Sequence, residues 1–448
     1  MKKFVLFLII LLPFVTGAQN GTYDLQSCID LALNNSPMLK NAQLDLAIHE
    51  NERATLRTKL LPQIDGEMDF IHNYNIQRII LENGAIPAFT NPSQPDGEVI
   101  AFQLQLRNTL SPSIHLNQLL FDKSLFETLK SDTIQNTLLK QKNEKSKTDI
   151  AVAVTKAYYS ILISQEQLDF LQNNLERVQT MRANTESRVK SGTARPIDVQ
   201  RIQVAVNNMQ AEIERSQQNV ALSKSILAQL MHLSPDTNIN LAGQLDESQL
   251  VEILPQSDAI QYGKRTEYSM LQTQKRLVES GLTIEKAGYY PRIYGYAVTG
   301  YNPSATDFYN LFQASRFYNY TMIGVHMSVP IYHGDEKRYK LNKYALQEQK
   351  IENSLTEIKE MIDYQTEQAR IKYDHSLEAI KIQKENLTLA EENTSAIKIE
   401  NDKGISGTID VLNSETDLRL AQTNYYNALF QAIMAKVDYD QAVGNINY

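Results

Sequence analysis

The stretch Arg-Val-Lys-Ser-Gly-Thr-Ala-Arg-Pro-Ile-Asp-Val at residues 188–199 indicates the fold, because Asn-Asp-Lys-Gly-Ile-Ser-Gly-Thr-Ile-Asp-Val at residues 401–411 repeats it. Gly192 matches Gly404 at an offset of 212 residues, and the same offset relates the two Ile-Asp-Val triplets. In each copy a long helical pattern ends at a glycine, which supplies a left-handed turn, and a second pattern begins within a few residues. One such turn alone is typical of an ordinary loop between two helices. Two copies at a fixed offset favour a duplicated helical hairpin instead.

The first 18 residues have the pattern of a secretory signal peptide. Lys2 and Lys3 precede an apolar run at residues 4–12, and Thr-Gly-Ala at residues 16–18 supplies a small-residue cleavage site. The apolar run is too short for a membrane-spanning helix, and no other stretch is long and apolar enough to be one. We therefore expect an exported chain without a helical membrane anchor.

Charge, cysteine content and motifs exclude several functional classes. Removal of the two lysines changes the formal net charge from −8 to −10, which disfavours nucleic acid as a partner. Cys28 is the only cysteine, so we exclude an intramolecular disulfide framework and interpret Cys28 as a core residue of the first helix. The seven histidines lack metal-ligand spacing, and neither a phosphate-binding glycine loop nor a nucleophile elbow is present. We predict no enzymatic activity, no metal site and no cofactor.

Four segments change from the helical period of about 3.6 to the period of 2 that is typical of strands. In the first half we predict strands at residues 63–76 and 100–120, separated by a loop at residues 79–97 that is rich in Pro, Gly and Asn. In the second half we predict strands at residues 292–302 and 317–332. Matched positions on either side show that the first strand–loop–strand segment is 18 residues longer, an insertion that we assign to the loop.

The helices that lead to the two turns carry apolar residues at alternating steps of four and three, which predicts antiparallel coiled-coil packing. Many of these positions hold Ser or Ala, so we expect each helix to pack also against neighbours outside its own hairpin. The return helix at residues 197–231 is shorter than the outgoing helix at residues 125–188. Residues 37–61 supply the missing length, which predicts two short helices stacked end to end against one long helix.

The strands carry apolar residues on one face and Asp, Glu, Gln or Arg on the other, which fits two structures. One is an ordinary soluble sheet, and the other is an outer-membrane barrel with lipid outside and water inside. We favour the barrel, because the helices are committed to coiled coils and Tyr and Phe crowd the strand ends as in an aromatic girdle. A sheet edge cannot face hydrocarbon, and four strands are too few to close a barrel. The chain is therefore expected to oligomerise.

The chain resembles the TolC-like family of outer-membrane efflux proteins, the outer-membrane factors. The residues that carry the resemblance are both turns and the following segments: Leu25-Gln-Ser-Cys-Ile-Asp-Leu-Ala-Leu33 with Ser36-Pro37, Leu61-Pro62, Leu120-Phe121-Asp122 and Val443-Gly444. The resemblance implies a homotrimer in the outer membrane of a Gram-negative-type cell, with a 12-stranded barrel that continues into an α-helical tunnel across the periplasm. It further implies a passive exit duct of a tripartite efflux or type I secretion system, which works with a periplasmic adaptor protein and an inner-membrane transporter.

We therefore predict a mainly α fold with a transmembrane β-barrel portion, built from two tandem structural repeats. The first repeat spans residues 19–232 and the second spans residues 259–448, with an exposed connector at mid-height between them, residues 233–258. Each repeat contributes a pair of barrel strands and a long helical hairpin, whose tips we place at residues 191–196 and 403–408.

The resemblance also points to site residues at the tips. In the family, acidic residues near the second tip line a periplasmic constriction, which corresponds to Asp410 here, with Asp198 as its counterpart in the first tip. The family pattern has a second acidic residue where this chain has Asn413, and an arginine where it has Ser406, so the family's ion-pair lock is not reproduced. The tip residues expected to contact the adaptor are Ser191, Gly192, Thr193, Ala194, Lys403, Gly404, Ile405 and Ser406.

A rival hypothesis is a periplasmic adaptor or another coiled-coil scaffold without a membrane barrel, because such proteins also have helical hairpins with tips. The amphipathic strand pairs and the duplication disfavour it. The sequence leaves open whether the exported substrate is a drug, a metal or a protein.

Overall fold

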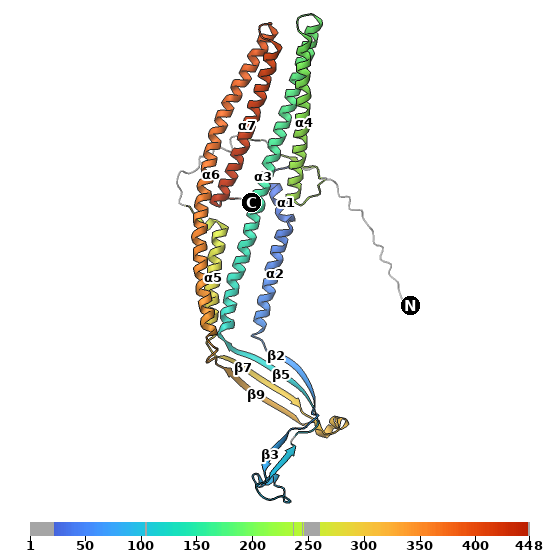
Figure 1. Ribbon diagram of the computed structural model, residues 1–448, viewed down its shortest axis with the longest axis vertical. Helices are drawn as coiled ribbons and strands as arrows, with labels where there is room; N and C mark the ends of the chain where they lie inside the picture. Colours follow the sequence, from blue (N-terminus) through green and yellow to red (C-terminus); the bar gives the residue numbers. More distant parts are fainter. Residues whose placement is uncertain (1–21, 104, 236, 244, 246–259, 447–448) are drawn as a thin grey trace, which may run out of the picture. The chain divides into compact units, whose positions relative to one another are not determined.

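The computed structural model describes the whole chain except residues 1–21, 104, 236, 244, 246–259 and 447–448 (Figure 1). The predicted signal peptide and most of the predicted connector therefore lie outside the described residues. The chain divides into two compact units. The helical unit comprises Met1–Asp45, Leu138–Gln272 and Glu352–Tyr448, and the sheet unit comprises Leu46–Thr137 and Thr273–Ile351.

The order of elements is the same in both halves, as the two-repeat interpretation requires. In the first half it is α1 and α2, the strands, then α3 and α4; in the second half it is α5, the strands, then α6 and α7. The helices are α1 Leu25–Asn35, α2 Pro37–Thr58, α3 Lys123–Lys190, α4 Pro196–Leu230, α5 Thr266–Ala287, α6 Glu336–Asp402 and α7 Thr408–Val443. The predicted helix from residue 259 is shorter than expected, because Tyr262–Lys264 form a 3-10 turn (η3) before α5 begins.

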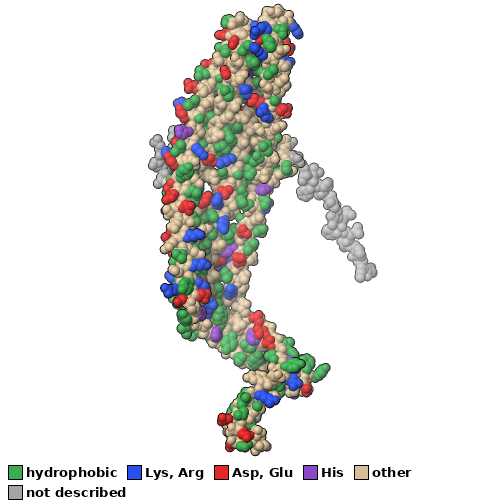
Figure 2. All heavy atoms as spheres, viewed as in Figure 1, with side chains coloured by type: hydrophobic (Ala, Val, Ile, Leu, Met, Phe, Trp, Pro, Cys, Tyr) green, Lys and Arg blue, Asp and Glu red, His purple; other side chains and the backbone are tan. Residues whose placement is uncertain are grey.

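Two antiparallel hairpins, α3–α4 and α6–α7, lie side by side in the helical unit with their tips at the same end (Figure 1). In the first hairpin the predicted apolar stripes meet, because Val178 of α3 is buried with Ile202 and Val206 of α4. In the second, Ile380 of α6 is buried with Leu429 and Ala432 of α7. Charged and hydrophobic side chains are interspersed over the helices in Figure 2, in keeping with narrow apolar stripes.

Polar contacts in the helical unit join the return helices to the short helices. In the first repeat, Asn35 Nδ2 at the end of α1 donates to the Met231 carbonyl just beyond α4 (3.1 Å). In the second repeat, the buried Arg265 precedes α5 and donates from Nη1 to the Ala442 carbonyl near the end of α7 (2.9 Å). The end of a helix leaves carbonyls without intrahelical partners, so both contacts satisfy groups that the fold would otherwise leave bare.

The main core of the helical unit forms where α1, α3 and α4 meet. Cys28 and Ala32 of α1 are fully buried there, together with Val154 and Ile161 of α3 and Leu227 of α4. The interpretation of Cys28 as a core residue is confirmed. Strand β1 (Thr22–Tyr23) pairs in parallel with β6 (Asn240–Leu241) beside this core.

Four antiparallel strands form the main sheet of the sheet unit, in the order β2-β5-β7-β9. Their bounds are β2 Gln63–His72, β5 Asn108–Asp122, β7 Arg292–Tyr301 and β9 Asn319–Ser328, and the short β8 (Ser304–Ala305) pairs with β5. Ile64, Leu116, Ala297 and Ile323 lie directly across from one another on one face. The opposite face carries Asp65, Glu67 and His115, and His115 Nε2 lies 3.3 Å from Glu67 Oε2.

The strand at residues 100–120 was predicted as one element and is two. Strand β4 (Val99–Gln103) pairs with β3 (Arg78–Glu82) in a separate sheet, whereas β5 pairs with β2 and β7. The first strand ends at His72 rather than 76, and the predicted loop from residue 79 begins inside β3. Periodicity reports the spacing of apolar residues but not the pairing partner, so it could not show where one sheet ends and the next begins.

The last predicted strand, residues 317–332, is also shorter, because β9 ends at Ser328. Pro330 has no N–H to donate to a ladder. Gly334 and Asp335 then take positive φ values of 58° and 61°, which turn the chain before α6 begins at Glu336. Among the described helices, none combines the length and the hydropathy needed to cross a membrane.

The burial of Cys28 makes a prediction about its reactivity. Burial raises the pKa of the Cys28 thiol to about 12, so the thiol stays protonated at pH 8 and only the thiolate is the nucleophile. We expect the folded protein not to react with a maleimide at pH 8, and one thiol per chain to react after denaturation. Labelling of the folded protein at the rate of a free cysteine, followed by mass spectrometry, would show that the first helix does not pack as described.

Candidate functional site

The first hairpin tip is a short turn closed by the backbone. Helix α3 ends at Lys190 and α4 begins at Pro196. Gly192 has φ 77°, and the N–H of Thr193 donates to the Arg188 carbonyl (2.8 Å), which satisfies the end of α3. The exposed tip residues are Ser191, Gly192 and Thr193, and Ala194 is half-buried.

The second tip uses the same geometry with different side chains. Helix α6 ends at Asp402, Gly404 has φ 75°, and the N–H of Ile405 donates to the Glu400 carbonyl (2.9 Å). Asn401 Nδ2 also donates to the Ser406 carbonyl (2.8 Å). The side chain of Ile405 is 72% exposed, so this tip presents an apolar residue that nothing in its own hairpin covers.

Asp198 is tied into its own tip. Only 7% of the residue is exposed, and its two carboxylate oxygens accept hydrogen bonds from Arg195 Nη2 (3.1 Å) and Nε (3.2 Å). These hydrogen bonds hold the pKa of the Asp198 carboxyl below its ordinary value, with a smaller contribution from the charge of Arg201. The charge of Asp198 is therefore largely compensated where it stands.

Asp410 differs from its counterpart because it is exposed and forms no ion pair within the described part of the chain. Its Oδ2 accepts a hydrogen bond from the N–H of Gly407 (2.8 Å), which caps the start of α7. A carboxylate in the first turn also favours the positive end of the helix dipole. Asn413 lies one turn further along α7 and is exposed as well. The cap occupies one oxygen of Asp410 and leaves the charge accessible to solvent.

A buried carboxylate that sequence reasoning missed lies between the hairpins, about one and a half turns beyond Asp410. Glu415 of α7 is only 5% exposed. Its Oε2 lies 3.3 Å from Arg177 Nε of α3, and its Oε1 pairs with Lys398 Nζ of α6. Glu415 therefore holds cations from both hairpins, and we call these three residues the Glu415 cluster.

Two further polar contacts join the hairpins. Arg188 Nη1 of α3 donates to Asn401 Oδ1 of α6 (2.9 Å), and Arg419 Nη1 of α7 donates to Glu212 Oε2 of α4 (2.9 Å). The only signal in the sequence was a glutamate flanking an apolar stripe. Its partners could not be named, because Arg177 is 238 residues away.

Residues 28–231 match the family model described as outer membrane efflux protein. The fold of the rest of the chain agrees with this match. The chain belongs to the outer membrane efflux protein family.

Relatives of known name or structure span nearly the whole chain. Alkaline protease secretion protein AprF of Pseudomonas aeruginosa is 24% identical over 435 residues, which cover 93% of this chain and 82% of that protein. The solved structure of CusC is 14% identical, with a TM-score of 0.75 over 94% of this chain and 91% of that one. The open state of the MtrE outer membrane channel of Neisseria gonorrhoeae is 16% identical, with a TM-score of 0.72 over 94% and 88% of the two chains.

VceC, an outer membrane protein of Vibrio cholerae, is 16% identical, with a TM-score of 0.69 over 94% of this chain and 96% of that one. Together these matches cover both repeats, the sheet and the helices. As a member of the outer membrane efflux protein family, the chain is an outer-membrane protein with a large periplasmic helical part. The family is one of transport ducts.

The Glu415 cluster makes a prediction about stability. Glu415→Gln keeps the shape of the side chain but removes the charge that holds Arg177 and Lys398, and hydrogen bonds to charged groups contribute about 1.5–3 kcal/mol. Glu212→Gln is the matched control, because Glu212 pairs with Arg419 at a more exposed position, where an ion pair contributes about 0–1 kcal/mol. We expect a clearly lower thermal midpoint, measured by circular dichroism, for the Glu415 variant only. Equal midpoints for the two variants would show that the cluster does not join the hairpins.

Proposed function

We propose that this protein is the outer-membrane exit duct of a tripartite efflux or type I secretion system, which conducts its substrate passively and is not an enzyme. The observation that carries the proposal is the sheet. One face is apolar and exposed, the other is polar, and the strands continue directly into helices, since β5 ends at Asp122 and α3 begins at Lys123. An apolar face without a covering layer suits lipid, and a polar face suits a water-filled lumen.

The open edges of the sheet support a homotrimer. Within the described residues, β2 and β9 are each paired on one side only. Unpaired backbone groups cannot face hydrocarbon, so both edges need partners. Because β2 and β9 lie at opposite edges, β2 of one copy can pair with β9 of the next, and three copies of four strands reach the number of strands that small barrels have.

The tips support a contact with a periplasmic adaptor and, through it, with an inner-membrane transporter. Ser191, Thr193, Lys403 and Ile405 are exposed in turns that their own hairpins leave uncovered. An adaptor has helical hairpins of its own, and exposed turns of this kind are suited to such a partner.

A constriction at the periplasmic end fits Asp410 better than Asp198. The carboxylate of Asp410 is exposed and unpaired, whereas Arg195 compensates Asp198. Three copies of Asp410 around a narrow opening would repel one another and attract cations. Asn413, one turn away, would line the same opening without adding charge.

The rival function, a coiled-coil adaptor or scaffold, leaves the sheet unexplained. Such a protein needs no four-stranded sheet with Ile323 83% exposed on an uncovered face. The substrate is not fixed by these observations, since AprF is named for alkaline protease secretion and other family members for efflux.

The number of subunits is the first test. In a mild detergent, we expect native mass spectrometry or light scattering to give about three times the mass of the mature chain, because closure needs twelve strands. A stable monomer that retains its β-structure would contradict the barrel.

The second test separates a pore charge from a helix cap. Asp410→Asn keeps a side-chain acceptor for the Gly407 N–H but removes the charge, so we expect altered cation selectivity or weaker block by multivalent cations in planar-bilayer recordings, at nearly unchanged thermal stability. Asp198→Asn is the control and should change conductance less. Lower stability with unchanged conductance for the Asp410 variant would show that the residue only caps α7.

A further inference from the structure

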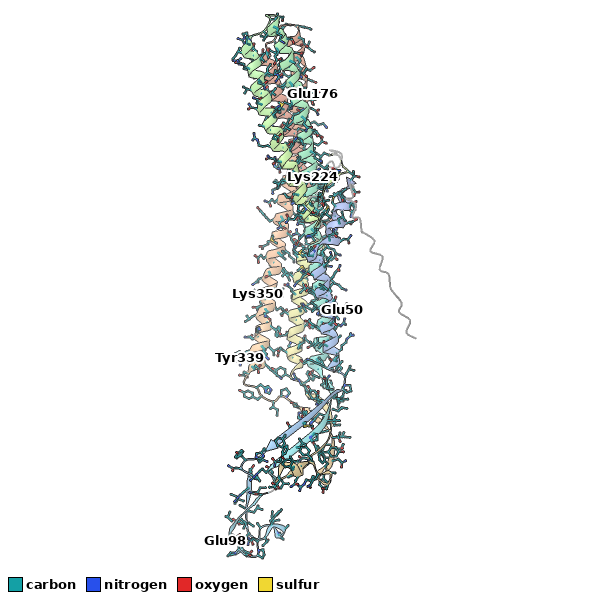
Figure 3. The ribbon with its side chains drawn as sticks, turned by 90° about the vertical axis from the view of Figure 1, so that its right-hand side faces the viewer. Glu50, Glu98, Glu176, Lys224, Tyr339 and Lys350 are labelled. Atoms are coloured by element: carbon teal, nitrogen blue, oxygen red, sulfur yellow. The ribbon has the colours of Figure 1, made fainter. Side chains whose placement is uncertain are left out.

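The β3–β4 hairpin is an element without support from its own chain. Its two strands form a separate sheet, and neither makes extensive contact with another helix or strand of the described residues. Figure 3 shows the hairpin beyond the end of the main sheet, with Glu98 labelled near its far end. A lone two-stranded hairpin is at best marginally stable in water.

The loop of the hairpin is nevertheless well ordered by its own contacts. Asn83 is 3% exposed, and its Nδ2 donates to the carbonyls of Gln94 (2.6 Å) and Asn91 (3.1 Å). The Asn83 Oδ1 accepts from the N–H of Asn91 (2.8 Å). Gly84 and Gly97 have φ values of 87° and 89°, which the loop needs at these two turns. The hairpin is therefore a built element rather than a slack insertion.

One face of the hairpin is apolar and uncovered. Ile100 is 7% exposed on the face that it shares with Leu81, its directly paired partner. On the other face, Ile80 pairs with Ala101 and Glu82 pairs with Val99, so Ile80 and Val99 are diagonal neighbours. These two side chains are 67% and 65% exposed. A partner that covers them would remove apolar surface from water and stabilise the hairpin.

The topology of the closed sheet determines what lies beside this face. Strand β2 ends at His72, five residues before β3 begins, and β2 is an edge strand. Strand β9, the other edge, begins at Asn319 and runs antiparallel to β7, so its start lies at the same end of the sheet as the end of β2. When β2 pairs with β9 of a neighbouring copy, the hairpin comes next to the residues that precede the neighbour's β9.

Those residues expose aromatic side chains. The segment from Asp307 to Tyr318 contains two 3-10 turns, η4 (Phe308–Phe312) and η5 (Ala314–Arg316). Phe308 stacks edge-to-face on Phe70 of its own sheet, with ring centroids 5.6 Å apart. Three rings remain largely exposed: Tyr309 at 88%, Phe312 at 59% and Tyr318 at 77%.

We infer that the β3–β4 hairpin docks on the neighbouring copy, with Ile80 and Val99 against the exposed aromatic side chains of residues 308–318 of that copy. The inference rests on the proposed closure of the sheet by three copies. It gives the 18-residue length difference between the two halves a role, because only the first half carries the clasp. Within one copy the same contact is excluded for Tyr318, since β5 and β7 separate β2 from β9 by roughly 14 Å at the usual strand spacing.

Two cysteine pairs test closure and docking separately. Tyr74→Cys with Tyr318→Cys joins residues next to the ends of the two edge strands and tests closure. Ile80→Cys with Tyr318→Cys, treated with a short bismaleimide, tests docking. The buried Cys28 is retained in both. We expect both pairs to give covalent dimers and trimers on denaturing gels, and each single-cysteine variant to give monomers.

The outcomes of this experiment are distinct. A ladder from the Tyr74 pair without one from the Ile80 pair overturns the docking and leaves the duct intact. Failure of both pairs overturns the closure on which the docking rests. Cross-linking of Ile80→Cys alone would show that the hairpins meet one another instead, which also overturns the inference.

A stability measurement keeps the inference testable if the cysteine variants assemble poorly. Ile80→Ser combined with Val99→Ser removes the apolar face without affecting the core, because both side chains are exposed in the single chain. We expect the trimer to dissociate several degrees lower in detergent. Ile86→Ser, an exposed apolar residue of the hairpin loop, is the control and should leave the dissociation temperature unchanged. An unchanged temperature for the double variant would contradict the docking.

Discussion

The unpaired backbone of two edge strands is the constraint on which the rest of this structure depends. A sheet with an apolar face suits a membrane, but the N–H and C=O groups along β2 and β9 cannot be left in hydrocarbon. Four strands cannot curl far enough to pair with themselves. The chain must therefore repeat its sheet around an axis, and the helices that follow the strands must also be arranged around that axis.

The helical hairpins fit this requirement through what they lack. Their apolar stripes are narrow, so a hairpin alone buries little surface, and polar contacts supplement the packing between neighbours. Glu415 illustrates this, because a carboxylate that is 5% exposed is tolerable only when Arg177 and Lys398 approach it from two different helices. Contacts of this kind join two hairpins without sealing them into one core, which suits a tube wall better than a globule.

Much of the fold could be predicted from the sequence, because the duplicated turns fixed the register of the two halves. The glycines at 192 and 404 have the positive φ values that the hairpin tips require. The pairing of strands could not be predicted in full, since β4 and β5 have the same period and differ only in their partners. The Glu415 cluster was missed because its members are far apart in the sequence. The roles of Asp198 and Asp410 stay predictions, although Arg195 already distinguishes the two carboxylates.

Amide hydrogen exchange of the assembled protein in detergent tests the central claim most directly, because it reads the pairing of each strand. The inner strands β5 and β7 serve as internal standards, since both are paired on two sides in a single chain. The account predicts that β2 and β9 are protected as strongly as β5 and β7. Fast exchange along β2 and β9 beside slow exchange in β5 and β7 would mean that the edges remain open, and the barrel would be wrong.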